Sequence, residues 1–284
     1  ITEDEAERAA IYHKIDSISY LASDYFIPNE YDKLMSFIGS EGTNAYTSTD
    51  MTVYVEQIPS NQIENWARIQ ADRFANPVIR GFHTELETVY EEKNMSLTKD
   101  FRKALEAMDG MLFPDHPYGT QTVLGTQEHL KNPSITNIKN YQKTYYVPNN
   151  MAICLSGDFD PDEMVAVIEK YFSQMEPNKD LPEITLTTSS KIESPVEKNV
   201  YGLDAENVMI GWKYPGAKSE DALVADVAAS VLYNGSAGLI DLNINQQQKV
   251  LGAYGMSYGR PDAGEFILMG NPKQGQTLEE VRDI

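Results

Sequence analysis

The chain has 284 residues, enough for about two domains that each bury their own core. Hydrophobic residues make up 41% and aromatic residues 10%, which is typical of a folded globular protein and excludes collagen-like or low-complexity chains. The formal net charge of −20 at pH 7 opposes binding to nucleic acid, because phosphate binding depends on clustered Lys and Arg. The apolar runs are too short to cross a bilayer, so we expect no transmembrane segment.

The first part of the chain predicts helices around a hairpin of two strands. Apolar residues recur at helical spacing in four segments, one of which ends at Gly39 in the manner of a glycine C-cap. Within the hairpin, Met51, Val53 and Val55 alternate with polar residues, which predicts two adjacent strands with one buried face. The expected helices cover about residues 3–20, 30–38, 61–74 and 84–108, and the expected strands cover 42–50 and 51–56.

A strand followed by a capped helix occurs twice in the chain. Residues 151–155 predict a strand, and Asp160 then caps a helix that has proline at its first position. Residues 265–269 predict a second such strand, and Thr277 with Glu280 forms the capping box of the next helix. Two copies of one unit more than a hundred residues apart indicate a duplicated domain.

The expected fold class is α+β, with two homologous domains that resemble α/β sandwiches and have antiparallel-rich sheets. The first domain covers about residues 1–180, a Pro- and Thr-rich linker covers 181–196, and the second domain covers 197–284. The chain opens almost inside a helix and closes after two turns of an apolar stripe. We therefore expect a fragment of a longer protein, with both domains incomplete.

A self-contained active site is not evident in the sequence. None of the four histidines lies at metal-ligand spacing from another, and nucleophile-elbow, P-loop and dinucleotide-binding motifs are absent. His83 and Glu85 imitate the H-x-E of zinc deaminases, but a chain with one cysteine cannot supply the required P-C-x-x-C. The histidines are His13, His83, His116 and His129.

One acidic helix is the main candidate for a functional site. Thr84 and Glu87 are expected to form a capping box, which places Glu85 in the first helical turn. Glu92 follows seven residues later, and a step of seven returns to nearly the same helix face. Carboxylates on such a face are either solvated edge residues or ligands for a metal.

Other singled-out residues have a structural interpretation beside a functional one. His116 precedes a proline and either shapes a loop or takes part in catalysis, and Asn44 either bonds to a substrate or stabilises a turn. Trp66, Trp212 and Cys154 lie at apolar positions and are expected to pack in the core.

The acidic helix and two further segments resemble one known family. The pattern Glu85-x-x-x-Val89-x-x-Glu92-x-Asn94 is similar to the acidic helix of the pitrilysin/insulysin family of zinc metallopeptidases, the inverzincins. The N-A-Y-T-S run at 44–48 looks like the strand of that family whose edge pairs with the bound peptide. The resemblance spans about residues 30–175, and its further motifs are Asp100, Arg102, the H-P-Y-G run at 116–119, Gly125, Tyr145, Tyr146, Pro148, Asn150, Met151, Gly157 and Asp158.

The resemblance implies a zinc-dependent function for the longer protein. It implies that Glu92 is the third zinc ligand, that Glu85 is an accessory glutamate, and that Asn44, Ala45, Tyr46 and Thr47 lie along the peptide substrate. The family's H-x-x-E-H, which supplies two histidine ligands and the general base, is absent from the chain. We expect it upstream of Ile1, so the chain alone is expected to be inactive and to bind no zinc.

The predicted function is that of a fragment of a zinc endopeptidase, which cleaves peptides or unfolded polypeptides with metal-activated water. The alternative is a non-catalytic scaffold or peptide-binding partner subunit, since families of this kind include members that lack the metal motif. The expected partners are a peptide substrate and a second or homologous subunit, without nucleic acid. The helical segment at residues 3–25 resembles nothing in the short loop that the family has there, so we interpret it as the tail of an insertion. Related bacterial enzymes with such insertions are often exported, so the expected compartment is the bacterial periplasm or cell envelope.

Overall fold

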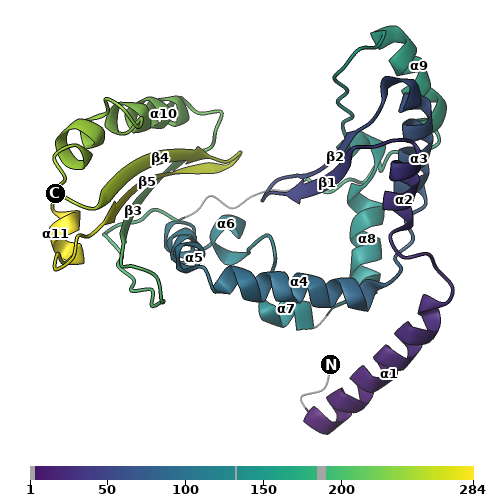
Figure 1. Cartoon of the computed structure of the whole chain (residues 1–284), viewed down its shortest axis with the longest axis horizontal. Helices are drawn as coiled ribbons and strands as arrows, with labels where there is room; N and C mark the ends of the chain where they lie inside the picture. Colours follow the sequence, from purple (N-terminus) through teal and green to yellow (C-terminus); the bar gives the residue numbers. More distant parts are fainter. Residues whose placement is uncertain (1–3, 132, 184–189) are drawn as a thin grey trace. The chain divides into compact units, whose positions relative to one another are not determined.

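The computed structural model describes residues 4–131, 133–183 and 190–284. The chain divides into two compact units (Figure 1). Unit 1 contains residues 1–92 and 124–184, and unit 2 contains residues 93–123 and 185–284. Both mix helices with antiparallel strand pairs, which confirms the expected α+β class. The division into homologous domains at 181–196 stays a prediction.

Unit 1 consists of helices around one hairpin. Its elements are α1 (Glu5–Ser23), α2 (Glu30–Phe37), β1 (Gly42–Thr47), β2 (Thr52–Gln57), η1 (Ser60–Gln62), α3 (Ile63–Ala75), most of α4 (Phe82–Leu97), α7 (Gln127–Lys131), α8 (Ile135–Tyr145), η2 (Pro148–Asn150) and α9 (Pro161–Phe172). The expected helices at 3–20, 30–38 and 61–74 are confirmed as α1, α2 and α3.

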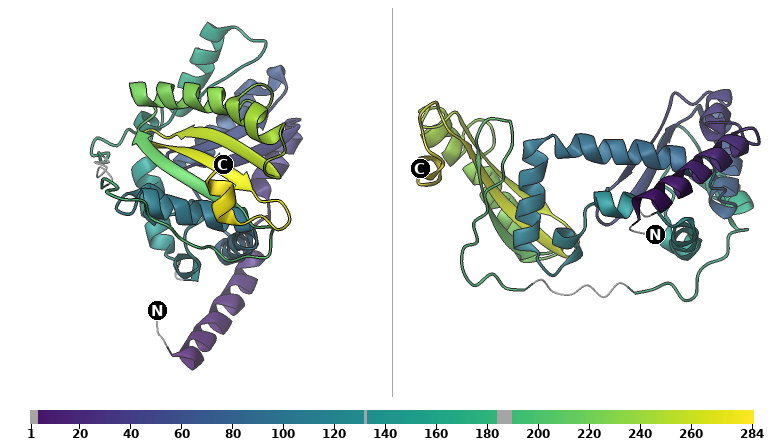
Figure 2. Two further views of the ribbon diagram at one scale, coloured as in Figure 1. Left: turned by 90° about the vertical axis from the view of Figure 1, so that its left-hand side faces the viewer. Right: turned by 90° about the horizontal axis from the view of Figure 1, so that it is seen from below.

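Unit 2 is a three-stranded sheet with helices on both faces. Its elements are α5 (Asp100–Leu112), α6 (Pro117–Thr120), β3 (Val208–Pro215), α10 (Glu220–Leu232), the π-helical turn η3 (Asp241–Asn245), β4 (Gly252–Gly259), β5 (Ala263–Asn271) and α11 (Leu278–Arg282). The sheet order is β3-β5-β4, and both pairs are antiparallel. Figure 2 shows this sheet between α10 and α5.

Helix caps form where the sequence predicts them. The Asp160 carboxylate accepts hydrogen bonds from the amides of Asp162 and Glu163, with Pro161 at the first position of α9. Thr277 and Glu280 form the complete capping box of α11. These caps depend only on residues within one helical turn, which is why the sequence alone identifies them.

The predicted hairpin is present, but its expected buried face is not. β1 pairs with β2 in register from Gly42 opposite Gln57 to Thr47 opposite Thr52, and neither strand contains a buried residue. The core of unit 1 instead includes Met35, Trp66 and Ala67, packed against partly buried side chains of α9. The prediction of a core position is therefore confirmed for Trp66.

Two predicted elements differ from the structure because of interactions beyond the periodic pattern. Residues 151–155 form no strand in the described part of the chain, since a strand requires a partner for its backbone hydrogen bonds. The single helix expected at 84–108 is two helices, α4 and α5. The break follows from Thr98, whose amide and hydroxyl both bond to the carbonyl oxygen of Met95 in a tight turn.

Two side chains expected in the core are exposed. Cys154 lies on the surface of the segment that forms no strand, so no sheet covers it. Trp212 is 50% exposed, since it contacts the ring of Phe266 on the neighbouring strand and leaves its other faces open. The core positions predicted for Cys154 and Trp212 from their apolar neighbours in the sequence are therefore wrong.

A buried ionic cluster holds α5 against the turn between β4 and β5. Arg260 is 5% exposed, and its Nη2 lies 2.9 Å from Asp109 Oδ1 and 3.7 Å from Glu265 Oε1. The guanidinium also lies over the rings of Phe113 and Tyr118, at 4.8 and 4.3 Å from their centroids. One buried cation thus lies beside two carboxylates, of which Glu265 is buried and Asp109 is partly exposed.

Burial leaves Glu265 about half protonated at neutral pH. Burial raises the pKa of Glu265 to about 7; the charge of Asp109 also raises it, whereas Arg260 lowers it. The cross-strand neighbours of Glu265 are Lys213 on β3 and Tyr258 on β4. A proton on Glu265 balances the cluster, because one guanidinium then faces one carboxylate.

We therefore predict that unit 2 loses stability as the pH rises through neutrality. The pKa of Glu265 is about 7 in the fold and 4.5 in an exposed glutamate, so its contribution is complete below about pH 4.5 and lost as the pH rises through about 7. The melting temperature is expected to fall by roughly 5–10 °C from pH 5 to pH 8, which corresponds to about 2–3 kcal/mol. Circular dichroism of Glu265→Gln should show most of this pH dependence removed.

The matched control is Glu193→Gln, which changes an exposed glutamate of unit 2. It should retain the pH dependence of the unsubstituted chain. The same dependence in Glu265→Gln as in Glu193→Gln would contradict a proton held at Glu265.

Candidate functional site

Helix α4 carries the two acidic side chains singled out in the sequence. Glu85 lies in its first turn and Glu92 seven residues later, and both are exposed. A spacing of seven places them on nearly the same face of the helix, two turns apart. The predicted arrangement on one face is thus compatible with the observed helix.

The start of α4 differs from the predicted capping box. The helix begins at Phe82, so His83 and Thr84 lie inside its first turn rather than before it. Gly81 precedes the helix with φ +62°, and its carbonyl oxygen accepts the amide of Glu85 at 3.1 Å. A left-handed backbone is readily adopted by glycine, which is why the helix starts earlier than the Thr84 pattern indicates.

The residues around Glu92 do not by themselves form a zinc site. Among the described residues there is no group of three His, Cys, Asp or Glu side chains that could hold a metal. A catalytic zinc ion takes three protein ligands and a water molecule. Glu92 offers one exposed carboxylate, and the described residues form no group of three such side chains around it.

The strand predicted to meet a peptide is exposed and has one neighbour. Asn44, Ala45, Tyr46 and Thr47 are all exposed on β1, and in the described part of the chain β2 is the sole strand paired with it. Ser48 donates its amide to Met51, and bonding alternates along an antiparallel pair, so the amide of Ala45 points to the open edge.

The side chain of Asn44 occupies this open edge. Its Oδ1 accepts the amide of Ala45 at 2.8 Å, which satisfies a donor that would otherwise face solvent. A peptide that bonds to the Ala45 amide would have to displace Asn44 Oδ1 from it. The structural and the substrate-binding interpretations of Asn44 therefore both involve this amide.

The H-P-Y-G segment forms a compact turn within unit 2. His116 is buried and caps α6, where its Nδ1 accepts the amide of Tyr118 at 3.1 Å. The Tyr118 hydroxyl bonds to Asp262 at 3.2 Å. The structural interpretation of His116 as a residue that shapes a loop is consistent with these contacts.

A polar network behind β2 was not anticipated from the sequence. One oxygen of Glu56 accepts hydrogen bonds from the Tyr31 hydroxyl at 2.7 Å and from the Gln70 amide at 2.8 Å. Burial raises the pKa of Tyr31, so its hydroxyl remains a donor. Arg73 lies over the ring of Tyr31, 3.9 Å from its centroid, and 3.9 Å from the Glu56 oxygen.

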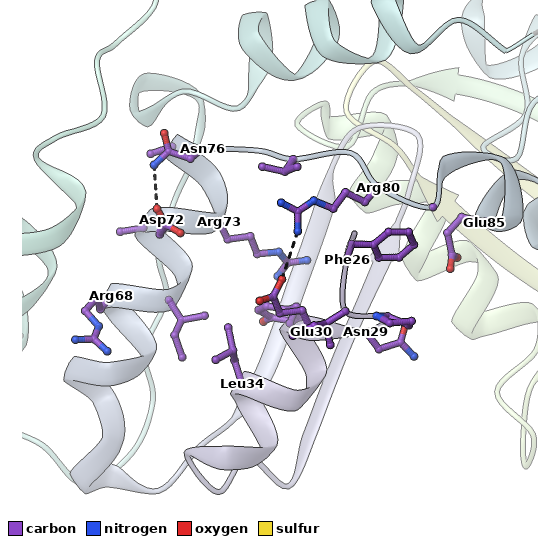
Figure 3. Close-up of a pocket in the computed structure, with 18 of the residues that line it drawn as sticks. Phe26, Asn29, Glu30, Leu34, Arg68, Asp72, Arg73, Asn76, Arg80 and Glu85 are labelled. Carbon is purple, nitrogen blue, oxygen red and sulfur yellow. Dashed lines mark hydrogen bonds and ion pairs between the residues drawn. The ribbon is translucent and has the colours of Figure 1, made fainter. Parts of the chain in front are cut away.

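This network borders a pocket of about 1180 Å³ in unit 1. Its walls come from α2, α3, the start of α4, the segments that precede α2 and α4, and the end of α9. Figure 3 shows Arg73 and Arg80 extending toward one another near Glu30. Three arginines within residues 68–80 were the available sequence signal for this pocket.

Comparison with known proteins identifies the family. Residues 134–282 match the family described as the Peptidase M16 inactive domain. The chain therefore belongs to the M16 peptidase family, in agreement with the pitrilysin-like resemblance, and the protease and metalloprotease terms apply to its relatives.

The relatives are distant in sequence and longer than this chain. Zinc protease PqqE of Helicobacter pylori is 22% identical over 93% of the chain and 61% of the relative. Mitochondrial-processing peptidase subunit beta of Neurospora crassa is 24% identical over 57% of the chain and 33% of the relative. The chain thus spans about 60% or less of the length of these relatives.

Solved structures share the fold. The crystal structure of a protease from Helicobacter pylori matches with a TM-score of 0.77 and 20% identity, over 89% of this chain and 63% of that one. The periplasmic protease PqqL from Escherichia coli matches with a TM-score of 0.68 and 17% identity, over 90% of this chain and 32% of that one.

The tight turn after α5 gives a prediction for two neighbouring glycines. A Cβ atom at Gly119 would overlap the carbonyl oxygens of Asp109 and Phe113, so Gly119→Ala is expected to lower the free energy of unfolding by about 2–3 kcal/mol. The matched variant is Gly110→Ala within α5, where the nearest atom is 3.7 Å away. It should stabilise the chain by about 0.5–1 kcal/mol. Denaturant unfolding of both variants checks this, and equal effects would contradict the packing described.

Proposed function

We propose that this chain is part of a zinc-dependent endopeptidase in which Glu92 contributes one metal ligand. The observation that supports this most is an exposed carboxylate on α4, in a chain of the M16 family, at the position that the family resemblance gives to a zinc ligand. Glu85, on nearly the same face, is proposed as the accessory carboxylate. The histidine ligands are proposed to come from residues outside this chain, so the chain alone has no peptidase activity.

The proposed substrate is an extended peptide that adds as a strand beside β1. Backbone amides and carbonyls of an exposed strand edge bind a peptide without strong sequence preference, which suits cleavage of unfolded polypeptides. The exposed run from Asn44 to Thr47 and the edge amide of Ala45 support this.

A second candidate function is that of a non-catalytic partner subunit. It is supported by the family description, which names an inactive domain, and by the relative named as a processing-peptidase subunit. In this function β1 would bind peptide and Glu92 would have no metal. A paired homologous subunit is proposed in either case.

The proposed compartment is the bacterial periplasm or cell envelope. The structural relative PqqL is a periplasmic protease, whereas other relatives are mitochondrial. The described residues contain no helix long and apolar enough to cross a membrane.

Peptide cleavage by the complete product of the gene that encodes this chain tests the enzyme proposal. Glu92→Gln is expected to reduce kcat/KM by a hundredfold or more and to weaken zinc retention, because loss of a ligand weakens the metal site. The control is Glu91→Gln, the adjacent exposed glutamate, which points about 100° away on the helix. Equal activity of both variants, or a complete product without zinc or cleavage, would favour the partner-subunit function instead.

Peptide binding by this chain tests the role of β1. Ala45→Pro removes the edge amide but leaves the bonds to β2 in place, so binding of an unfolded polypeptide should weaken about tenfold. Ala45→Val retains the amide and should bind like the unsubstituted chain. Fluorescence anisotropy measures both, and equal weakening by the two variants would show that side-chain size rather than the amide matters.

A further inference from the structure

Cationic side chains are concentrated in the pocket of unit 1. The chain has seven arginines in all, and three of them, Arg68, Arg73 and Arg80, line this pocket. The carboxylates of Glu30, Asp72 and Glu85 also line the pocket, so arginines and carboxylates balance there, whereas the chain as a whole carries 43 acidic against 23 basic residues. Arginine is also the side chain best suited to bind a planar carboxylate, because its guanidinium donates two parallel hydrogen bonds.

Arg73 is held in place by aromatic rings. Its guanidinium lies 3.9 Å from the Tyr31 ring centroid and 4.7 Å from that of Tyr54. The Glu56 oxygen 3.9 Å away already accepts two shorter hydrogen bonds, and the bond from Arg73 to Gln70 is long, 3.4 Å. A preorganised guanidinium that is 32% exposed therefore faces the pocket with donors that a ligand can use.

Arg80 reaches the same space from the segment before α4. Its Nη1 lies 3.7 Å from the Glu30 carboxylate, and both side chains are about half exposed. An exposed ion pair of this kind is weak, and a ligand carboxylate can replace Glu30 in it. Figure 3 shows the Arg73 and Arg80 guanidinium groups converging on Glu30, while Arg68 extends away from them.

The pocket also has an apolar wall beside the two guanidinium groups. Leu34 of α2, Ile69 of α3 and Val78 of the segment before α4 line it, and Val78 is 66% exposed. A ligand with one carboxylate and an adjoining aliphatic group would satisfy both parts of the surface. Free inorganic anions would use only the cationic part.

We propose that this pocket binds the side-chain carboxylate of an acidic peptide, with Arg73 and Arg80 as its cationic contacts and an adjoining apolar residue on the wall of Leu34, Ile69 and Val78. Glu30 competes for the same guanidinium groups and lowers the affinity. The site requires neither zinc nor pairing at β1, so its failure leaves the proposed function unaffected.

The test is binding of a short blocked peptide in which one glutamate is flanked by leucines, labelled with an uncharged fluorophore. The reference peptide has glutamine in place of glutamate, which removes the charge and keeps the shape. Fluorescence anisotropy at low salt is expected to show about tenfold tighter binding of the glutamate peptide to the unsubstituted chain.

Two variants of opposite effect identify the site. Arg80→Gln should bring the affinity for the glutamate peptide down to that for the glutamine peptide, and Glu30→Gln should raise it several-fold. Arg8→Gln on α1 removes the same charge outside the pocket and should change nothing. The test does not depend on Arg73→Gln, a substitution that leaves the buried Glu56 without its cation.

Two results would overturn the proposal. One is equal affinity for the two peptides, which would show that no carboxylate is recognised. The other is that Glu30→Gln and Arg80→Gln both bind the glutamate peptide with the same affinity as the control Arg8→Gln. Any preference for the charged peptide would then come from another part of the chain.

Discussion

A catalytic zinc ion needs three protein ligands, and the face of α4 that carries Glu85 and Glu92 offers two carboxylates. This requirement determines what the chain can contribute to chemistry. Glu85 and Glu92 share one exposed helix face, which leaves room for ligands from another segment, whereas the described residues offer no cluster that completes the site. The proposed pairing of a peptide at the β1 edge needs no metal, because the donors and acceptors there belong to the backbone. The proposed binding and the proposed chemistry can therefore be tested separately.

Helix α5, which follows the acidic helix α4 in the chain, packs within unit 2. α5 covers one face of the β3-β5-β4 sheet through Met108, Leu112 and Phe113, and Arg260 joins it to the β4–β5 turn through Asp109. Removal of one partner from such a buried ionic cluster leaves an uncompensated charge, which makes the cluster sensitive to substitution and to pH. Apolar packing and an ion pair thus both hold α5 against the sheet of unit 2.

The sequence predicted the features that depend on neighbouring residues. The caps at Asp160 and Thr277, the hairpin and the three N-terminal helices rest on patterns within a few residues, and the structure confirms them. The strand at 151–155 and the buried position of Cys154 failed, because both depend on partners distant in the chain. The family motifs give Glu92 and the β1 run as candidate site residues, and these roles stay predictions. The sequence did not predict the arginine pocket, because Arg73 and Arg80 approach one another only when α2, α3 and the segment before α4 are packed together.

Glu92 is proposed as one ligand of a zinc ion whose other ligands lie outside this chain. The most direct measurement is a crystal structure of the complete gene product with zinc. We expect a carboxylate oxygen of Glu92 at about 2.0–2.2 Å from the metal, together with two histidine nitrogens. A metal bound elsewhere, or a complete product that takes up no zinc, would contradict it.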